Sequence, residues 1–498
     1  MAMYLYSRFA NVTFRPWLIL FFSGVFFALS QLTPTLWWGT FLGLVLFLLG
    51  VWRLLSWRKV VVGGLLVGTL KAMGGFAWVW HTYPLDWLSI DNVGLQFFLI
   101  GLYWLTTSIF MGAGIALPAF AAYYLRSRTG LVVAIFPIVW LVGEVLGSLS
   151  ASLWLLGPGS YLNIYIGHGY AGLPLAQFDR LLPFMSVGGL YGLTYVAALI
   201  GVLLTLAMVR QNKILVAGVS ILLLLTVTLN IFVPAGEDVI TGLKVIAVDT
   251  TFTADSQKTD IGRVTKQREV TAAIIAAAKH HPDIILLPED SRFSRAYAEP
   301  DDARRRLQLL LPEFNGIVVD TARIDTDDGA ILRAFYHDMS ADRTYITDKQ
   351  FLVPQGEYVT YPFHFLLKLF DQNEVITRTD RNQNYIPGPI ADYQDFPSHI
   401  PPMIFCFESS SVLGIGRIKD RQNLPLILHP ISHSWFNDPY ILEYQLEAML
   451  KVQAVWNKVT VVTAGNMTES IIYYPDGRME EGSEIQATPG WRLVLYEL

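Results

Sequence analysis

Long apolar stretches separated by short polar segments dominate the first 233 residues. A membrane-spanning helix needs about 20 mainly apolar residues. Seven stretches reach or approach this length, at about 16–33, 35–55, 60–80, 94–122, 130–148, 181–208 and 214–233. Pro34 separates the first two, which predicts a helical hairpin. No small-residue cleavage pattern follows the first stretch, so we interpret it as a retained anchor rather than a signal peptide. The pattern predicts an all-α transmembrane domain of about seven helices over residues 1–233.

Residues 234–498 show a different pattern, in which short apolar runs alternate with helical periodicity. The runs at 243–249, 284–288, 316–321, 403–406, 424–428, 459–463 and 469–474 predict strands. Helical spacing at 261–280, 302–311 and 439–456 predicts helices between them. Alternation of this kind is typical of a layered α/β domain.

Two segments of this second part do not fit the alternation. Residues 358–372 are aromatic and aliphatic with few charges, which fits either a core helix or hairpin or an arm that contacts lipid. Residues 373–402 are polar and rich in proline, which predicts an irregular loop.

The charge distribution separates the same two parts. Residues 1–233 hold 11 Lys/Arg and 4 Asp/Glu, whereas residues 234–498 hold 25 Lys/Arg and 37 Asp/Glu. The second part is therefore net negative by 12 (25 − 37). This sign is wrong for binding nucleic-acid phosphates, so we expect no nucleic-acid partner. The composition also excludes a single water-soluble domain and a disordered chain.

The cations of the first part predict its orientation in a membrane. Nine of them flank one set of helix ends, and the loops at the other ends hold three Asp and one cation, Arg180. Cytoplasmic loops carry an excess of Lys and Arg. We therefore expect a cytoplasmic N-terminus, and seven spans would place residues 234–498 on the extracytoplasmic side. The nine cations are Arg8, Arg15, Arg53, Arg58, Lys59, Arg126, Arg128, Arg210 and Lys213.

Two charged residues lie within predicted spans. An isolated charge in a membrane costs roughly 3 kcal/mol on insertion scales, so Lys71 and Glu144 need partners or access to the interface. We favour structural pairing over a functional relay. The loop at 149–180 is rich in Gly and Tyr and long for a connection, and we interpret it as an interfacial segment that shapes a lipid-accessible cavity.

The candidate catalytic residues of 234–498 are a cysteine, a lysine and two glutamates. Cys406 is the one cysteine of the chain, so it cannot form an intramolecular disulfide. Glu289 follows a predicted strand in LLPED, and Lys349 and Glu357 lie in KQFLVPQGE. A nucleophile, a base and a cation are the groups that acyl transfer requires. Each residue alone has an ordinary structural explanation.

The histidines do not predict a metal site. His280 and His281 are adjacent, and His429 and His433 are four apart in a predicted strand and loop rather than on a helix. The sequence also lacks a glycine-rich phosphate loop. We therefore expect no metal and no cofactor.

Several motifs together resemble a known family. In order along the chain they are LLPED around Glu289, KQFLVPQGEYV at 349–359, IFCFES around Cys406, SWFND at 434–438 and AGNMTESIIYYPDGR at 464–478. In the membrane part, Pro137, Trp140, Glu144 and GLYGLT at 189–194 add to them. The chain resembles the nitrilase (carbon–nitrogen hydrolase) superfamily, and closely its membrane branch, the apolipoprotein N-acyltransferases. The resemblance implies an α-β-β-α sandwich for residues 234–498.

The resemblance also implies a reaction. Cys406 would attack a phospholipid ester and form a thioester, with Glu289 as the base. Lys349 would stabilise the oxyanion, helped by the backbone N–H of Phe407, and Glu357 would orient Lys349 or the acceptor. The acyl chain would then pass, in a ping-pong reaction, to the N-terminal amine of a lipid-modified lipoprotein. The family implies a bacterial inner membrane, with the catalytic domain on the periplasmic side.

This sequence also departs from the family pattern. Phe351 and Gln355 replace family residues near Lys349, and 432–434 read Ser-His-Ser where the family favours Asn and Gly. The segment 465–468 is altered as well, and the family's usual final transmembrane helix does not follow the catalytic domain. Two alternatives therefore stay open: a membrane amidase or N-acyltransferase with another amine or amide substrate, and an inactive membrane-anchored binding module. Acyl-chain, head-group and acceptor preference are also left open.

Overall fold

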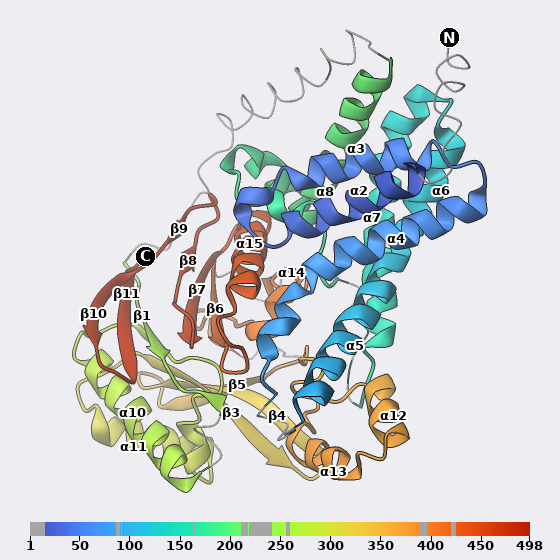
Figure 1. The fold of residues 1–498 in the computed structure, drawn as a ribbon. Helices are drawn as coiled ribbons and strands as arrows, with labels where there is room; N and C mark the ends of the chain where they lie inside the picture. The colour runs from blue at the N-terminus through green and yellow to red at the C-terminus, as the bar shows by residue number, and fades with distance from the viewer. Residues whose placement is uncertain are drawn as a thin grey trace.

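The computed structural model describes residues 15–85, 90, 92–158, 160, 162, 165–210, 218, 242–254, 259–388, 396–419 and 425–498. Its N-terminal part is a helical bundle that lies against one side of a C-terminal α/β domain (Figure 1). The boundary expected at residues 233 and 234 lies outside the described residues, and so does the stretch 214–233 apart from residue 218.

Six of the seven apolar stretches coincide with helices. Four segments are long and apolar enough to cross a membrane, namely Pro34–Val51, Val93–Leu125, Thr129–Trp154 and Asp179–Val209, so the expected number of seven is not confirmed. The first two helices form the hairpin expected around Pro34. The helices are α2 (Arg15–Ser30), α3 (Gly39–Val51), α4 (Trp57–Gly75), α5 (Val93–Gly112), α6 (Ala116–Leu125), α7 (Thr129–Trp154) and α8 (Leu182–Arg210).

Helix α7 shows why this part suits a membrane. Leu131, Ile135, Ile138, Val142 and Leu146 are exposed and follow one another at spacings of three or four residues, so they share one face. At 1.5 Å per residue, the 26 residues of α7 extend about 39 Å. The hydrocarbon core of a bilayer is about 30 Å thick. A helix of this length with an exposed apolar face indicates membrane association.

The two charged residues that were predicted to lie within spans are paired. Lys71 Nζ lies 2.8 Å from Glu144 Oε1, and both side chains are buried. Trp140 Nε1 and the backbone N–H of Ala171 donate to the same oxygen, at 3.1 and 2.9 Å. Glu144 therefore joins α4 and α7 to the loop at 149–180, as the structural interpretation expects.

The strands of the C-terminal domain form two leaves. One leaf has the order β10-β11-β1-β2-β3-β4-β5 and the other β6-β7-β8-β9, and a single residue pair, Thr250 and Asn466, joins β1 to β7. The strands are β1 (Lys244–Thr250), β2 (Ile284–Leu286), β3 (Ile317–Thr326), β4 (Gly329–Asp338), β5 (Arg343–Asp348), β6 (Leu426–Ser432), β7 (Thr460–Asn466), β8 (Ile472–Tyr473), β9 (Met479–Glu480), β10 (Ser483–Ala487) and β11 (Trp491–Glu497).

Alternate side chains of β1 define the layers. Val245 and Ala247 enter a core that they share with β6 and β7 of the other leaf. Ile246 and Val248 point the opposite way, into a core with α10 (Asp260–Ala278) and α11 (Pro300–Leu310). On the far side of the second leaf, Ile427 packs with α15 (Tyr440–Asn457). The domain is therefore the expected α-β-β-α sandwich.

Two predictions of local structure were wrong, one that was left open is decided, and one strand pair was missed. Residues 403–406 are not a strand: Met403 makes one isolated bridge to Leu428, and Cys406 begins the 3₁₀ helix η10 (Cys406–Ser410). The expected loop at 373–402 contains helix α13 (Asn373–Asn382), and 389–395 lie outside the described residues. Segment 358–372 forms a helix, α12 (Tyr361–Leu369). No strand was predicted for the hairpin β4–β5, although both strands carry apolar residues, Ala330–Leu332 in β4 and Tyr345 and Ile346 in β5.

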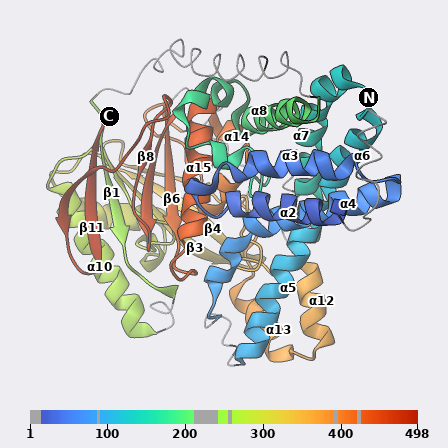
Figure 2. The ribbon, with the colours of Figure 1, turned by 45° about the horizontal axis from the view of Figure 1, so that its top comes forward.

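Helix α15 docks the α/β domain on the bundle, where it packs against α8 on one side and against β7 and β8 on the other (Figure 2). The α15 residue Trp456 lies against Gly189, whose φ of 55° kinks α8 and which leaves no room for a Cβ. Lys451 Nζ lies 2.6 Å from Asp179 Oδ1. The backbone N–H of Gly167 donates to Ser410 O at 2.9 Å, which ties the 149–180 loop to the end of η10. The membrane part thus holds the helix that begins with Cys406.

Candidate active site

Three of the predicted residues meet in a buried ion-pair group. Lys349 directly follows β5, and its Nζ lies 3.0 Å from Glu289 Oε1 and 2.7 Å from Glu357 Oε1. Glu289 follows β2, a parallel neighbour of the strands β1 and β3. The backbone N–H of Val353 donates to Glu357 Oε2 at 2.7 Å, which closes the loop after Lys349. The Lys349 ammonium is therefore held between two carboxylates.

Cys406 lies beside this group. It is the first residue of η10, and its thiol donates a hydrogen bond to Ser432 O with a sulfur–oxygen distance of 3.8 Å. Cys406, Phe407, Glu289 and Glu357 line one cavity. The first N–H groups of a helix have no acceptor within it, so the N–H of Phe407 is suited to bind an oxyanion. The structure thus brings all five predicted site residues to one place.

Burial and charge change the acidity of these groups. Burial, opposed by Lys349 and reinforced by Glu357, raises the pKa of Glu289 to about 7. Burial and the negative charge of Glu289 raise the pKa of the Cys406 thiol well above its ordinary value. Burial alone would lower the pKa of Lys349, but Glu289 and Glu357 outweigh it and raise this pKa. At neutral pH the resting site holds a neutral thiol and a charged lysine.

Glu408 is a site residue that the sequence analysis did not single out. Its Oε1 accepts the backbone N–H groups of Gln350 and Phe351 at 2.8 and 3.2 Å. Its Oε2 accepts the N–H of Phe405 at 2.8 Å, which caps η10. One buried carboxylate therefore fixes both the loop after Lys349 and the helix of Cys406. Its position in the motif IFCFES, two residues after Cys406, was the sequence feature that could have identified it as a site residue.

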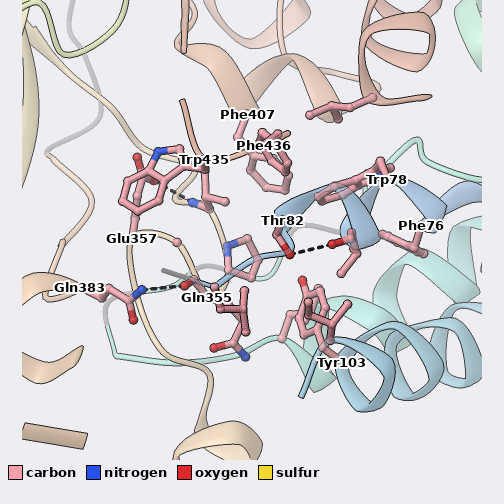
Figure 3. A pocket seen from close by; sticks show the side chains of 18 of the residues that line it. Phe76, Trp78, Thr82, Tyr103, Gln355, Glu357, Gln383, Phe407, Trp435 and Phe436 are labelled. Carbon is pink, nitrogen blue, oxygen red and sulfur yellow. Dashed lines mark hydrogen bonds between the residues drawn. The ribbon is translucent and has the colours of Figure 1, made fainter. Parts of the chain in front are cut away.

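The cavity is large, mostly apolar and built from both parts of the chain. Its volume is about 1440 Å³, including its opening to solvent. The bundle contributes Phe76, then Trp78 from η2 (Ala77–Thr82), and Tyr103 from α5. Figure 3 shows these side chains facing Trp435 and Phe436 of the α/β domain, with Glu357 at the other end. The sequence analysis expected the 149–180 loop to shape a cavity, and Leu155 and Ile166 of that loop line it.

Among the described residues, no group of three or more His, Cys, Asp and Glu is placed to hold a metal ion. His429 Nδ1 instead hydrogen-bonds Ile404 O at 2.9 Å, and His433 Nδ1 lies 3.4 Å from Glu443 Oε1.

Comparisons with known proteins relate the C-terminal half to solved structures. No protein-family model and no curated protein matches the chain. An amidase from Nesterenkonia sp. is 15% identical over 53% of this chain and 94% of that chain, with a TM-score of 0.34. Saccharomyces cerevisiae Nit3, a member of branch 10 of the nitrilase superfamily, is 14% identical over 52% of this chain and 90% of that chain, with a TM-score of 0.35. A CN-hydrolase superfamily protein from Xanthomonas campestris is 11% identical over 52% and 90%, with a TM-score of 0.33.

Proposed function

We propose that this chain is a membrane acyltransferase that moves an acyl chain from a phospholipid, through a thioester on Cys406, to the N-terminal amine of a lipid-modified lipoprotein. One observation carries the proposal: Cys406, Glu289 and Glu357 line a mostly apolar cavity to which helices of the bundle also contribute. Such a cavity suits a fatty acyl chain whose ester carbonyl reaches the thiol. The motifs shared with the apolipoprotein N-acyltransferases support the same reaction.

In the first half-reaction Glu289 takes the thiol proton as Cys406 attacks the ester carbonyl. A base with a pKa near the working pH is well suited to this transfer. The proton passes on to the departing lysophospholipid oxygen, and the acyl group stays on sulfur. Because the half-buried thiol is neutral at rest, attack and proton transfer have to be coupled.

Lys349 acts on the oxyanion of the tetrahedral intermediate. When Glu289 accepts the proton it loses its charge, which weakens its hold on Lys349 Nζ. The ammonium is then available to the developing oxyanion, while Glu357 keeps it in place from the other side. Phe407 N–H is the second donor.

In the second half-reaction the acceptor amine attacks the thioester, and Glu289 moves its proton to the sulfur of Cys406. The acceptor enters the same cavity after the lysophospholipid has left, which makes the reaction ping-pong. We assign the acceptor to the end of the cavity near Trp435 and His433, where the sequence departs from the family.

We propose the corresponding location in the cell. Residues 1–233 would form the membrane domain in a bacterial inner membrane with a cytoplasmic N-terminus, and residues 234–498 the periplasmic catalytic domain. The cations near Arg53, Arg126 and Arg128 support this orientation. Both substrates, a phospholipid and a lipoprotein, would then reach the site from the outer leaflet.

Product analysis tests the proposed function. Purified protein in detergent is incubated with a phospholipid carrying a labelled acyl chain and with a diacylated lipopeptide. We expect a labelled, N-acylated lipopeptide and a lysophospholipid in equal amounts. Released fatty acid without an acylated peptide, or ammonia from an amide, would instead indicate the amidase alternative. No product with any of these substrates would indicate an inactive binding module.

A further inference from the structure

His433 is a buried histidine beside the nucleophile Cys406. It has no role in the proton transfers of the proposed reaction. It follows Ser432, whose carbonyl accepts the thiol of Cys406. Its residue exposure is 2%, and it lines the same cavity as Cys406 and Glu289. Its Nε2 is buried and has no hydrogen-bond partner among the residues that the structure describes. A buried polar atom without a hydrogen-bond partner destabilises the folded protein. The presence of such an atom at a cavity wall therefore indicates that a ligand supplies the hydrogen bond.

Glu443 fixes the tautomer of this imidazole. His433 Nδ1 lies 3.4 Å from Glu443 Oε1, in the first turn of α15. The hydrogen bond with His433 lowers the pKa of Glu443, so this carboxylate is ionised at neutral pH and can only accept. Nδ1 therefore carries a proton, and in the neutral form of an imidazole the lone pair then lies on Nε2. The pair has the arrangement of a general base with its orienting carboxylate.

The acceptor of the proposed reaction creates a need for a second base. An α-amine has a pKa of about 7.7–8.0, so at pH 7 roughly one molecule in ten carries the neutral, nucleophilic nitrogen. The ammonium nitrogen holds three protons and the amide product keeps one. Two protons must leave it, and Glu289 can take only one in each turnover.

We propose that His433, oriented by Glu443, binds the acceptor ammonium through Nε2 and removes its first proton. This inference rests on the proposed function. The first proton passes from nitrogen to Nε2 and then to solvent, which generates the free amine. As the C–N bond forms and the C–S bond breaks, the second proton passes through Glu289 to the sulfur of Cys406. The imidazolium formed meanwhile is balanced by the charge of Glu443.

The other titratable groups around His433 do not replace it in this role. His429 approaches from β6, and His81 approaches Glu443 from η2, where its Nδ1 hydrogen-bonds Asn437 O at 3.1 Å. Across the cavity are Glu289, which is paired with Lys349, and Cys406. None of these groups contacts Nε2 of His433.

The test separates the two half-reactions. Protein acylated on Cys406 by phospholipid is freed of donor and mixed with a diacylated lipopeptide at pH 7 and at pH 9, and N-acylation is followed by mass spectrometry. For His433→Gln, acylation of Cys406 is measured separately, so that transfer is compared between proteins that carry equal amounts of thioester. We expect transfer to be about tenfold slower than wild type at pH 7, and within about twofold at pH 9, where the amine is already neutral. His399→Gln, which alters an exposed histidine paired with Asp338, should match wild type at both pH values.

Glu443→Gln gives a second variant in case His433→Gln does not fold. It should show the same pH-dependent loss, because the neutral amide introduced there cannot balance an imidazolium. A deficit equal at pH 7 and pH 9 would show a packing role and overturn the inference. Unchanged transfer at pH 7 would overturn it as well. If the wild-type protein itself forms no thioester or transfers to no amine, the proposed function fails and the inference fails with it.

Discussion

Lys349 Nζ lies 3.0 Å from Glu289 Oε1 in a site where the lysine side chain is fully buried and the glutamate side chain is 8% exposed. The same ammonium lies 2.7 Å from Glu357. A lone buried charge would be strongly unfavourable, so each of the three groups depends on the others. The arrangement couples stability to chemistry, because the cation that would bind the oxyanion also keeps two carboxylates compatible with burial.

Lys349→Met should therefore be both inactive and unstable. It leaves Glu289 and Glu357 facing each other without a cation, and breaking a buried pair in this way costs about 3–5 kcal/mol. Thermal unfolding in detergent measures this loss. The double variant Lys349→Met/Glu289→Gln should recover part of the stability and none of the acyl transfer. If Lys349→Met unfolds at the wild-type temperature, the ion-pair group does not have the structural role assigned to it.

The rate of Cys406 acylation should depend on the ionisation of Glu289. Its pKa is about 7, and only the carboxylate can accept the thiol proton, so the rate should fall as the pH drops below about 7. Glu289→Gln should lower the acylation rate by about 10²–10⁴-fold and abolish its fall at low pH. Single-turnover acylation across the pH range on either side of this pKa measures both effects. If the acylation rate of Glu289→Gln still falls at low pH, the titrating group is not Glu289.

Glu408 should matter although it does not touch the substrate in this account. Glu408→Ala would leave the N–H groups of Gln350, Phe351 and Phe405 without their acceptor, and an unsatisfied buried donor costs about 1–3 kcal/mol. We expect a loss of stability and a fall in kcat, with Glu408→Gln intermediate because its amide keeps one oxygen. Thermal unfolding and the acylation rate provide the measurements. Wild-type values for Glu408→Ala would show that its hydrogen bonds do not position the site.

The buried ion pair of the bundle predicts that a single and a double variant differ in stability. Lys71→Met leaves the buried Glu144 charge unpaired, whereas Lys71→Met/Glu144→Gln removes both charges and keeps an oxygen for Trp140 and Ala171. We expect the single variant to be less stable by about 3–5 kcal/mol and the double variant to approach wild type. Unfolding in detergent compares them. Equal stability of the single and double variants would contradict the structural interpretation of this pair.

The sequence predicted the fold well where hydrophobic patterns are long or where motifs mark strand ends. The apolar stretches predicted the positions of the bundle helices, although 94–122 contains two, α5 and α6. The motifs singled out Glu289, Lys349 and Cys406, which the structure brings together. Cys406 was placed on a strand because MIFC is a short apolar run, whereas capping by Glu408 starts a 3₁₀ helix there. Tertiary contacts of this kind leave no periodic signal.

The walls of the cavity could not be predicted for a similar reason. Trp78 and Tyr103 belong to apolar segments whose composition is equally typical of lipid-facing helices, and they line one cavity with Cys406 because the α/β domain packs against the bundle. His433 was considered as a metal ligand and as a departure from the family. Its pairing with Glu443, ten residues later, depends on how β6 lies against α15.

Acylation of Cys406 tests the central proposal most directly. Wild-type protein and Cys406→Ala are incubated with phospholipid in the absence of acceptor, and the intact mass of each is measured before and after hydroxylamine. The account predicts that wild type gains the mass of one acyl chain, that hydroxylamine removes it, and that Cys406→Ala gains nothing. Identical masses for the two proteins, or an adduct that persists in Cys406→Ala, would contradict it.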